Sequence, residues 1–228
     1  MTTTPGQLLE QCAEELNLAL NSHKLSFFLS LLSELKKWNS KVNLTSIRED
    51  EQIVLKHFID SLMLIPAVHP QGRLLDIGSG GGFPGLPLKI MLPALEVVSV
   101  DAVEKKILFQ RHIARILDLR KFSALHARVE HLPEKYHGCF DWIVTRAFSD
   151  LTAFAALGLP YLKPNGCMIA MKGRRGGEEA EDAENPLEEL GVRIDSCIGL
   201  KLPVSGDDRC LVVMHKTTGK PTGIYSGC

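Results

Sequence analysis

The stretch from Leu74 to Gly85, which reads LLDIGSGGGFPG, constrains the fold more than any other part of the chain. An apolar run typical of a buried strand passes directly into glycines. Glycine lets the backbone turn sharply and approach a ligand closely, because it has no Cβ and tolerates positive φ. Ligands of open α/β sheets bind at the carboxyl ends of the strands. The stretch therefore predicts a strand, a tight turn and a ligand site at that turn.

Short apolar runs and helical segments alternate after residue 73, which predicts a parallel, doubly wound sheet with helices on both faces. Strands are expected at 74–77, 97–100, 122–125, 142–144 and 167–171, and helices at 86–91, 104–117 and 151–157. A glycine-rich, acidic segment follows residue 173. Two last runs, 192–200 and 211–215, are expected to close the sheet as an antiparallel pair.

The first 65 residues show helical spacing of apolar residues instead. A capping box with proline at the first helical position, Thr4 to Gln7, predicts a helix over about residues 5–20. The pattern repeats from Leu25 to Trp38 and from Ile53 to Leu62. We expect a helical cap over 1–65 and a sheet domain over 66–228, forming one compact unit, as suits a chain of 228 residues.

Composition excludes several classes of protein. Six cysteines without a C-x-x-C pair predict no metal site. The longest nearly apolar stretch, 151–162, is too short to span a membrane, and residues 1–5 lack the features of a secretory signal, so a cytoplasmic protein without a membrane partner is expected. No obligate protein partner is evident.

Charge is unevenly distributed along the chain. Its net value is −1, but seven acids and no bases fall between Glu178 and Glu189, which leaves −1 + 7 = +6 elsewhere. Basic residues gather at 105–106 and at 172, 174 and 175. These groups are either solvated surface or contacts to a polyanion.

The glycine spacing helps to identify the ligand. Counted from Gly78, the dinucleotide pattern G-x-G-x-x-G fails, because its sixth position is Phe83. Counted from Gly80 it is satisfied, but Pro84 and the acidic Asp76 are then poorly placed for a pyrophosphate on a helix N-terminus. An acidic strand residue before G-x-G suits a nucleoside that carries a cationic amino acid better.

Polar residues follow the next strands at the same edge. Asp101 ends the second strand, where a carboxylate can accept hydrogen bonds from both ribose hydroxyls; the alternative is a cap for the next helix. Val129 and Glu130 follow the third strand, where backbone groups can read an adenine edge. Arg146 follows the fourth strand and faces the same crevice, unless it forms a surface salt bridge.

Together these positions resemble the S-adenosylmethionine-dependent methyltransferases, and more narrowly the glucose-inhibited division protein B (RsmG) family of 16S rRNA guanine-N7 methyltransferases. The narrow match rests on Trp38 to Thr45, His57 to Leu62, Leu74 to Gly85, Lys105-Lys106 and Thr145 to Phe148. The resemblance covers about residues 35–175, and the helical cap also fits. The sequence departs from the family at its C-terminus, which lacks a basic, proline-rich tail and ends from Thr217 in TTGKPTGIYSGC.

The resemblance implies a Rossmann-like class I methyltransferase fold with a mostly parallel seven-stranded sheet and an N-terminal helical cap. It implies S-adenosyl-L-methionine as cofactor, with S-adenosyl-L-homocysteine as product, and 16S rRNA or the small ribosomal subunit as partner. By resemblance, the cofactor contacts would be Gly78, Gly80, Phe83, Asp101, Val129, Glu130 and Arg146. The Trp38 to Thr45 segment would close over the cofactor or hold RNA, or else is a polar turn stabilised by its own asparagines.

The chemistry agrees with what the sequence lacks. Guanine N7 has an in-plane lone pair and no proton to lose, so methyl transfer to it requires alignment more than a general base. The chain has neither the Asn/Asp-Pro-Pro-aromatic loop of amine methyltransferases nor a Pro-Cys nucleophile. No catalytic acid or base is therefore assigned. Two alternatives remain, an NAD-dependent oxidoreductase and a non-catalytic rRNA-binding assembly factor on the same fold.

Overall fold

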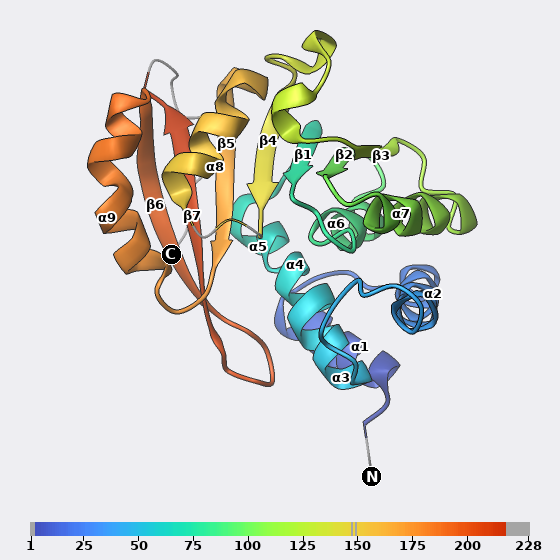
Figure 1. Cartoon of the computed structure of the whole chain (residues 1–228). Helices are drawn as coiled ribbons and strands as arrows, with labels where there is room; N and C mark the ends of the chain where they lie inside the picture. Colours follow the sequence, from blue (N-terminus) through green and yellow to red (C-terminus); the bar gives the residue numbers. More distant parts are fainter. Residues whose placement is uncertain (1–2, 147, 149, 218–228) are drawn as a thin grey trace.

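A computed structural model describes residues 3–146, 148 and 150–217 and contains a seven-stranded sheet of order β3-β2-β1-β4-β5-β7-β6 (Figure 1). The strands are β1 Arg73–Ile77, β2 Glu96–Asp101, β3 Phe122–His126, β4 Phe140–Thr145, β5 Leu162–Lys172, β6 Val192–Lys201 and β7 Asp208–Lys216. Strands β1 to β5 are parallel, while β7 is antiparallel to both of its neighbours, β5 and β6. The predicted fold class and the closing antiparallel pair are confirmed.

Helices cover both faces of the sheet, because alternate side chains of the buried strands point to opposite faces. Leu74 of β1 belongs to the core on the side of α6 and α7, and its neighbour Leu75 to the core on the side of α8 and α9. These helices are α6 Gly85–Met91, α7 Glu104–Ile116, α8 Leu151–Gly158 and α9 Gly176–Glu189. Short 3-10 turns lie at η2 Val129–His131, η3 Glu134–Tyr136 and η4 Leu159–Tyr161.

The N-terminal residues form a group of helices that lies beyond the carboxyl ends of the central strands (Figure 1). The group comprises α1 Pro5–Glu15, α2 Ser22–Asn39, α3 Asp50–Ile53, the π-helix η1 Val54–Ile59, α4 Asp60–Leu62 and α5 Leu64–Val68. Phe28 of α2 and Phe58 of η1 are buried in the same apolar cluster as Phe109 of α7. The site at the strand ends is therefore roofed by helices that share a core with the sheet.

The first helix and the acidic segment differ most from the sequence-based expectation, and β5 begins at Leu162 although its strand was expected from residue 167. The first helix was expected to reach residue 20, but α1 ends at Glu15 because Asn17 adopts a left-handed φ of 55° and Leu18 N–H donates to the Ala13 carbonyl. The acidic segment was given no helix, yet it forms α9, whose buried face consists of Gly176, Ala180, Ala183 and Leu187.

Ala147 of the matched motif and the atypical tail from residue 218 onward lie outside the described residues. Among the residues that are described, no helix is both long and apolar enough to cross a bilayer.

Candidate functional site

The glycine turn after β1 is anchored to the neighbouring strand. Gly78 N–H and Ser79 N–H donate to the Val100 carbonyl at 2.9 and 3.1 Å. Gly78 and Gly80 have positive φ values of 69° and 57°, a region that favours glycine. A Cβ placed on Gly80 would meet no atom within 4 Å, so the space beside this residue is open for a ligand.

Asp101 joins the glycine turn to the end of β2. Its Oδ2 accepts a hydrogen bond from Gly80 N–H at 2.8 Å, and its Oδ1 accepts one from Val103 N–H at 2.8 Å. The carboxylate therefore binds the backbone of the residue before α7, which is close to the predicted capping role. It is not the helix cap itself, because α7 begins at Glu104 without a side-chain cap. Each carboxylate oxygen can still accept a further hydrogen bond.

Two buried polar side chains near the glycine turn, Gln110 and Asp76, each have an acceptor atom that receives no hydrogen bond from the described residues. Gln110 of α7 donates through Nε2 to Ser79 Oγ at 2.8 Å and to the Gly80 carbonyl at 2.9 Å. Asp76 accepts from Gly85 N–H at 2.9 Å. Among the described atoms, Gln110 Oε1 and Asp76 Oδ1 are buried without a hydrogen-bond partner.

Burial gives Asp76 an unusual acidity. Desolvation raises the pKa of its carboxyl to about 7, while the Gly85 hydrogen bond and the positive charge of Arg146 oppose that rise. The carboxyl is therefore poised between its neutral and ionised forms near neutral pH. A cation bound beside Asp76 would favour the ionised form.

Arg146 lies at the end of β4 and is held by the helical cap. Its Nη1 donates to the Lys56 carbonyl at 2.8 Å and to Asp60 Oδ2 at 3.2 Å, and its Nη2 donates to His57 Nδ1 at 3.0 Å. Arg146 thus forms a salt bridge, as the alternative interpretation anticipated, but its side chain is 22% exposed and its partner Asp60 only 8%, so the pair is largely buried and not at the open surface. Its guanidinium carbon also lies 5.4 Å from the centroid of the Phe83 ring.

His57 connects Arg146 to the polar loop after α2. A guanidinium can only donate, so His57 Nδ1 accepts and the ring proton of the neutral form lies on Nε2, which is 2.8 Å from Thr45 Oγ1. Burial, and then the charge of Arg146, lower the pKa of His57 to about 3. His57 is therefore neutral over the physiological pH range.

The other residues predicted from the sequence, Phe83, Val129 and Glu130, differ in burial and in their distance from the glycine turn. Phe83 is 4% exposed and stacks on His57 with ring centroids 4.6 Å apart. Val129 is buried and its carbonyl accepts a hydrogen bond from the Tyr161 hydroxyl at 2.5 Å, whereas Glu130 is exposed. Their segment starts beside β2, because Ala127 N–H donates to the Asp101 carbonyl at 3.2 Å. The glycine turn, Asp101 and Arg146 thus share one edge of the sheet, with Val129 and Glu130 at its border.

The proposed basic surface needs one correction. Lys172 is buried, with a side chain only 6% exposed, and its Nζ lies 2.7 Å from Glu179 Oε2. It is therefore not a surface cation, because the acidic α9 packs over it. Arg174 and Lys105 are exposed, and Arg175 is exposed but paired with Glu178 at 3.0 Å.

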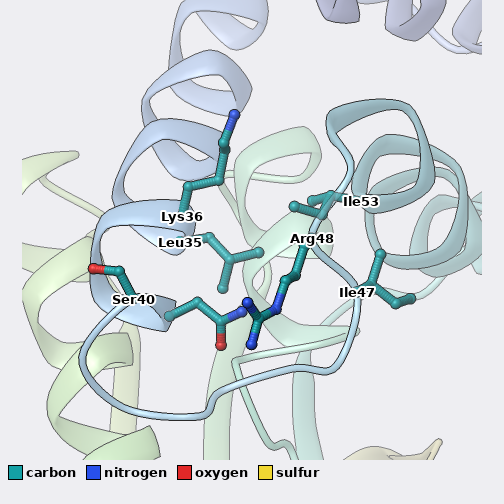
Figure 2. Close-up of a pocket in the computed structure, with 7 residues that line it drawn as sticks. Leu35, Lys36, Ser40, Ile47, Arg48 and Ile53 are labelled. Carbon is teal, nitrogen blue, oxygen red and sulfur yellow. The ribbon is translucent and has the colours of Figure 1, made fainter.

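The Trp38 to Thr45 segment is organised by its first asparagine. The Asn39 side chain accepts from Leu44 N–H and Thr45 N–H at 2.8 and 3.0 Å and donates to the Thr45 carbonyl at 3.0 Å. The segment borders a hollow of about 170 Å³, into which Arg48 points while Lys36 points away along α2 (Figure 2). The self-stabilised turn is confirmed for Asn39, and Thr45 also links the segment to the crevice through His57.

Four further residues contribute to this site without having been predicted individually from the sequence, namely His57, Asp60, Gln110 and Arg209. Asp60 Oδ1 accepts a hydrogen bond from Arg209 Nε at 2.6 Å, across 149 residues of sequence. His57 and Asp60 were part of the matched motif, and their spacing of three residues on a helix was the available signal. Nothing in the sequence pairs Arg209 with Asp60. No group of three or more His, Cys, Asp or Glu side chains within the described ranges could hold a metal ion.

Comparison with known structures supports the fold. A SAM-dependent methyltransferase from Aquifex aeolicus superposes with a TM-score of 0.56 at 17% identity, covering 81% of this chain and 97% of that one. A 16S rRNA adenine-N1 methyltransferase from Catenulisporales acidiphilia, with its cosubstrate SAM, gives a TM-score of 0.53 at 13% identity over 66% of this chain and 86% of that one. At such low identities the likeness concerns the fold alone.

Sequence comparison is more specific. Residues 24–202 match the family model described as GidB, rRNA small subunit methyltransferase G. The ribosomal RNA small subunit methyltransferase G of Geotalea uraniireducens is 57% identical over 95% of this chain and 99% of its own length. The enzyme of the same name from Geobacter metallireducens is 53% identical over 92% of this chain and 95% of its length. The chain therefore belongs to the rRNA small subunit methyltransferase G family.

Proposed function

We propose that the protein transfers the methyl group of S-adenosyl-L-methionine to N7 of a guanine in 16S rRNA. The observation that carries the proposal is the edge of the sheet where the open glycine turn, Asp101 and Arg146 meet, in a chain of this family. The substrate would be the small ribosomal subunit or its RNA, and the protein would act in the cytoplasm. The choice of guanine N7 rests on the family resemblance and on the absent amine and cytosine signatures.

The residues at this edge fit the cofactor. The open space beside Gly80 admits a ligand close to the backbone. Gln110, which donates to the Gly80 carbonyl, and Asp76 each keep one buried acceptor atom without a partner among the described atoms. Asp101 would accept hydrogen bonds from the ribose hydroxyls, and the backbone at Val129 and Glu130 would border the adenine. When bound, the cofactor supplies an electrophilic methyl group.

The protein's own contribution is positioning. Guanine N7 attacks through a lone pair and loses no proton, so no side chain need act as a base. The roof of helices, held to the strand ends by Arg146, would exclude water from the bound reactants. Alignment of two bound reactants in such a crevice supplies several kcal/mol of the barrier reduction.

The product assay tests the reaction. The protein is incubated with 16S rRNA or small subunits and methyl-labelled cofactor, the RNA is digested, and the labelled nucleoside is identified. The expected product is N7-methylguanosine. Label only on adenine, cytosine, ribose or protein would refute the proposed substrate.

A variant tests the cofactor placement. Asp101→Ala should lower the affinity for S-adenosyl-L-homocysteine by roughly 10- to 150-fold, because hydrogen bonds to a charged acceptor are worth about 1.5–3 kcal/mol. Calorimetry on the folded variant measures this, with the exposed Asp118→Ala as matched control. Unchanged affinity in Asp101→Ala would place the ribose elsewhere.

A further inference from the structure

Asp60 of the helical cap brings two guanidinium groups together. Its Oδ2 pairs with Arg146 Nη1 at 3.2 Å and its Oδ1 pairs with Arg209 Nε at 2.6 Å. The carboxylate is 8% exposed and the two arginines are 22% and 21% exposed. Arg146 follows β4 and Arg209 lies at the start of β7, so Asp60 links the cap to two strands that are far apart in the sequence and flank β5 in the sheet.

A cavity of about 210 Å³ opens beside this group. One water occupies about 30 Å³ in the liquid, so the cavity is large enough for a group bigger than a single water molecule. Met171 and Lys172, at the carboxyl end of β5, line it together with Arg146, Arg209 and Asp60. The cavity therefore lies on the same edge of the sheet as the glycine turn.

The charges around the cavity do not cancel. Lys172 is neutralised by Glu179, at 2.7 Å. Among the groups that line the cavity, this leaves the guanidiniums of Arg146 and Arg209 against the single carboxylate of Asp60, and the half-exposed Asp207, whose Oδ2 lies 3.9 Å from Arg209 Nη2, offsets part of the remaining positive charge. A planar guanidinium matches the geometry of phosphate and carboxylate oxygens better than an ammonium does. The cavity is therefore suited to an anion.

Its surroundings favour a polyanion over a small ion. Arg209 also lines a second, wider hollow of about 480 Å³ that includes the exposed Arg174 and Lys201. Lys201 Nζ is paired with Asp208 Oδ1 at 2.9 Å, and Arg209 Nη2 lies 3.9 Å from Asp207 Oδ2, so the cationic excess of this surface comes from Arg174. Leu200 and Arg209 line both hollows, so a strand with one phosphate in the cavity would have the second hollow beside it.

The chemistry of the reaction separates the phosphate from the target base. Methylation at N7 gives the guanine ring a positive charge, and that charge would develop unfavourably beside two guanidiniums. A phosphate in the cavity instead neutralises the excess charge. We propose that the Arg146–Asp60–Arg209 cavity binds a backbone phosphate of the RNA strand next to the target guanine, an inference that rests on the proposed function.

Direct binding measurements on Arg209→Gln test the site. The dissociation constant for 16S rRNA, measured by filter binding with S-adenosyl-L-homocysteine present, should rise by roughly 10- to 150-fold, and the slope of its logarithm against log salt should fall by about one. Affinity for S-adenosyl-L-homocysteine should stay within about twofold, because the described polar contacts of Arg209 are with Asp60, Asp207 and Asp208 and not with the glycine turn. Arg120→Gln is the matched control, since the Arg120 side chain is 84% exposed. It lies just before β3, at the amino ends of the parallel strands and therefore away from the cavity.

A second variant keeps the test decisive if Arg209→Gln does not fold. Arg209→Lys preserves the charge next to Asp60 but not the two-pronged donor, so RNA affinity should fall at least about fivefold while the salt slope is retained. Unchanged RNA affinity in either folded variant overturns the proposal. A loss of cofactor affinity with normal RNA affinity also overturns it and assigns the cavity to the cofactor. The proposed function is judged separately, on the nucleoside that the wild-type protein methylates.

Discussion

At the scale of single residues, His57 should make stability depend on pH. The folded protein keeps its pKa near 3, whereas an unfolded histidine titrates near 6.5. Below pH 6.5 the unfolded chain therefore binds a proton that the folded protein does not, and this contribution to stability is lost progressively as pH falls toward 3.

His57→Gln should remove that part of the acid sensitivity. Between pH of about 7.5 and about 5 the wild type should lose ~2 kcal/mol more than the variant in the free energy of unfolding. Urea denaturation at a series of pH values measures the difference. The exposed His131→Gln serves as control, and parallel pH profiles for wild type and His57→Gln would contradict the assignment of His57 as a buried neutral histidine.

Gln110 should act as a positioning residue for the glycine turn. Gln110→Leu keeps a side chain of similar size but leaves the buried Ser79 hydroxyl and the partly buried Gly80 carbonyl without their donor, at a cost of about 1–3 kcal/mol. If the turn is displaced, S-adenosyl-L-homocysteine affinity should fall about tenfold, which calorimetry measures. The exposed Gln11→Leu on α1 is the matched control, and a stability loss with normal ligand affinity would limit Gln110 to a structural role.

The residues of the site differ in how far the sequence predicts them. Gly80, Asp101 and Arg146 were predicted as site residues because each lies at the end of a strand or shortly after it, and the carboxyl ends of parallel strands meet at one edge. Gln110 could not be identified in this way, because its contact with Gly80 depends on how α7 packs against the turn. Asp60 and Arg209 meet only after the cap has docked on the sheet, so local patterns contain no information about their pairing.

At the scale of elements, α9 shows how an unfavourable local sequence is overridden. Its sequence begins with two glycines and contains Pro186, yet one apolar face with Ala180, Ala183 and Leu187 packs against the sheet. Tertiary burial of one face stabilises helices whose intrinsic propensity is low. The spacing of these three residues is typical of a helix. The segment was nevertheless not predicted as helical, because its many acidic residues and glycines are typical of a loop.

The two glycines at the start of α9 should respond oppositely to substitution. A Cβ at Gly176 would lie 2.6 Å from Cys210 Cβ and 2.7 Å from Lys172 Cβ, whereas a Cβ at Gly177 would meet nothing within 4 Å. Gly176→Ala should therefore destabilise the protein by about 1–3 kcal/mol through overpacking. Gly177→Ala should stabilise it by up to ~1 kcal/mol, because alanine favours the helix. Urea denaturation compares both with wild type, and equal effects would mean that α9 does not pack as described.

At the scale of the whole molecule, the helical cap and the sheet share one apolar core. A single cluster contains Leu9 of α1, Phe28 of α2 and Phe58 of η1 together with Leu74 of β1 and Val213 of β7. A polar contact also joins the cap to the sheet domain, since Glu34 Oε2 of α2 lies 2.7 Å from His112 Nε2 of α7. The boundary near residue 65, which the change in sequence pattern suggests, thus separates two patterns of secondary structure that we propose form one folding unit.

The protein should therefore unfold in a single cooperative transition. Without residues 1–65, the apolar face of α6 and α7 would lose the partners that bury it, and each fully buried large side chain contributes about 1.5–3 kcal/mol. Marginally stable domains do not survive the loss of several such contacts. We expect circular dichroism and tryptophan fluorescence, which reports Trp38 of α2 and Trp142 of β4, to give coincident urea transitions in the full chain, and the fragment 66–228 to lack a cooperative transition. Two separated transitions, or a fragment that unfolds cooperatively, would show that the cap is an independent appendage.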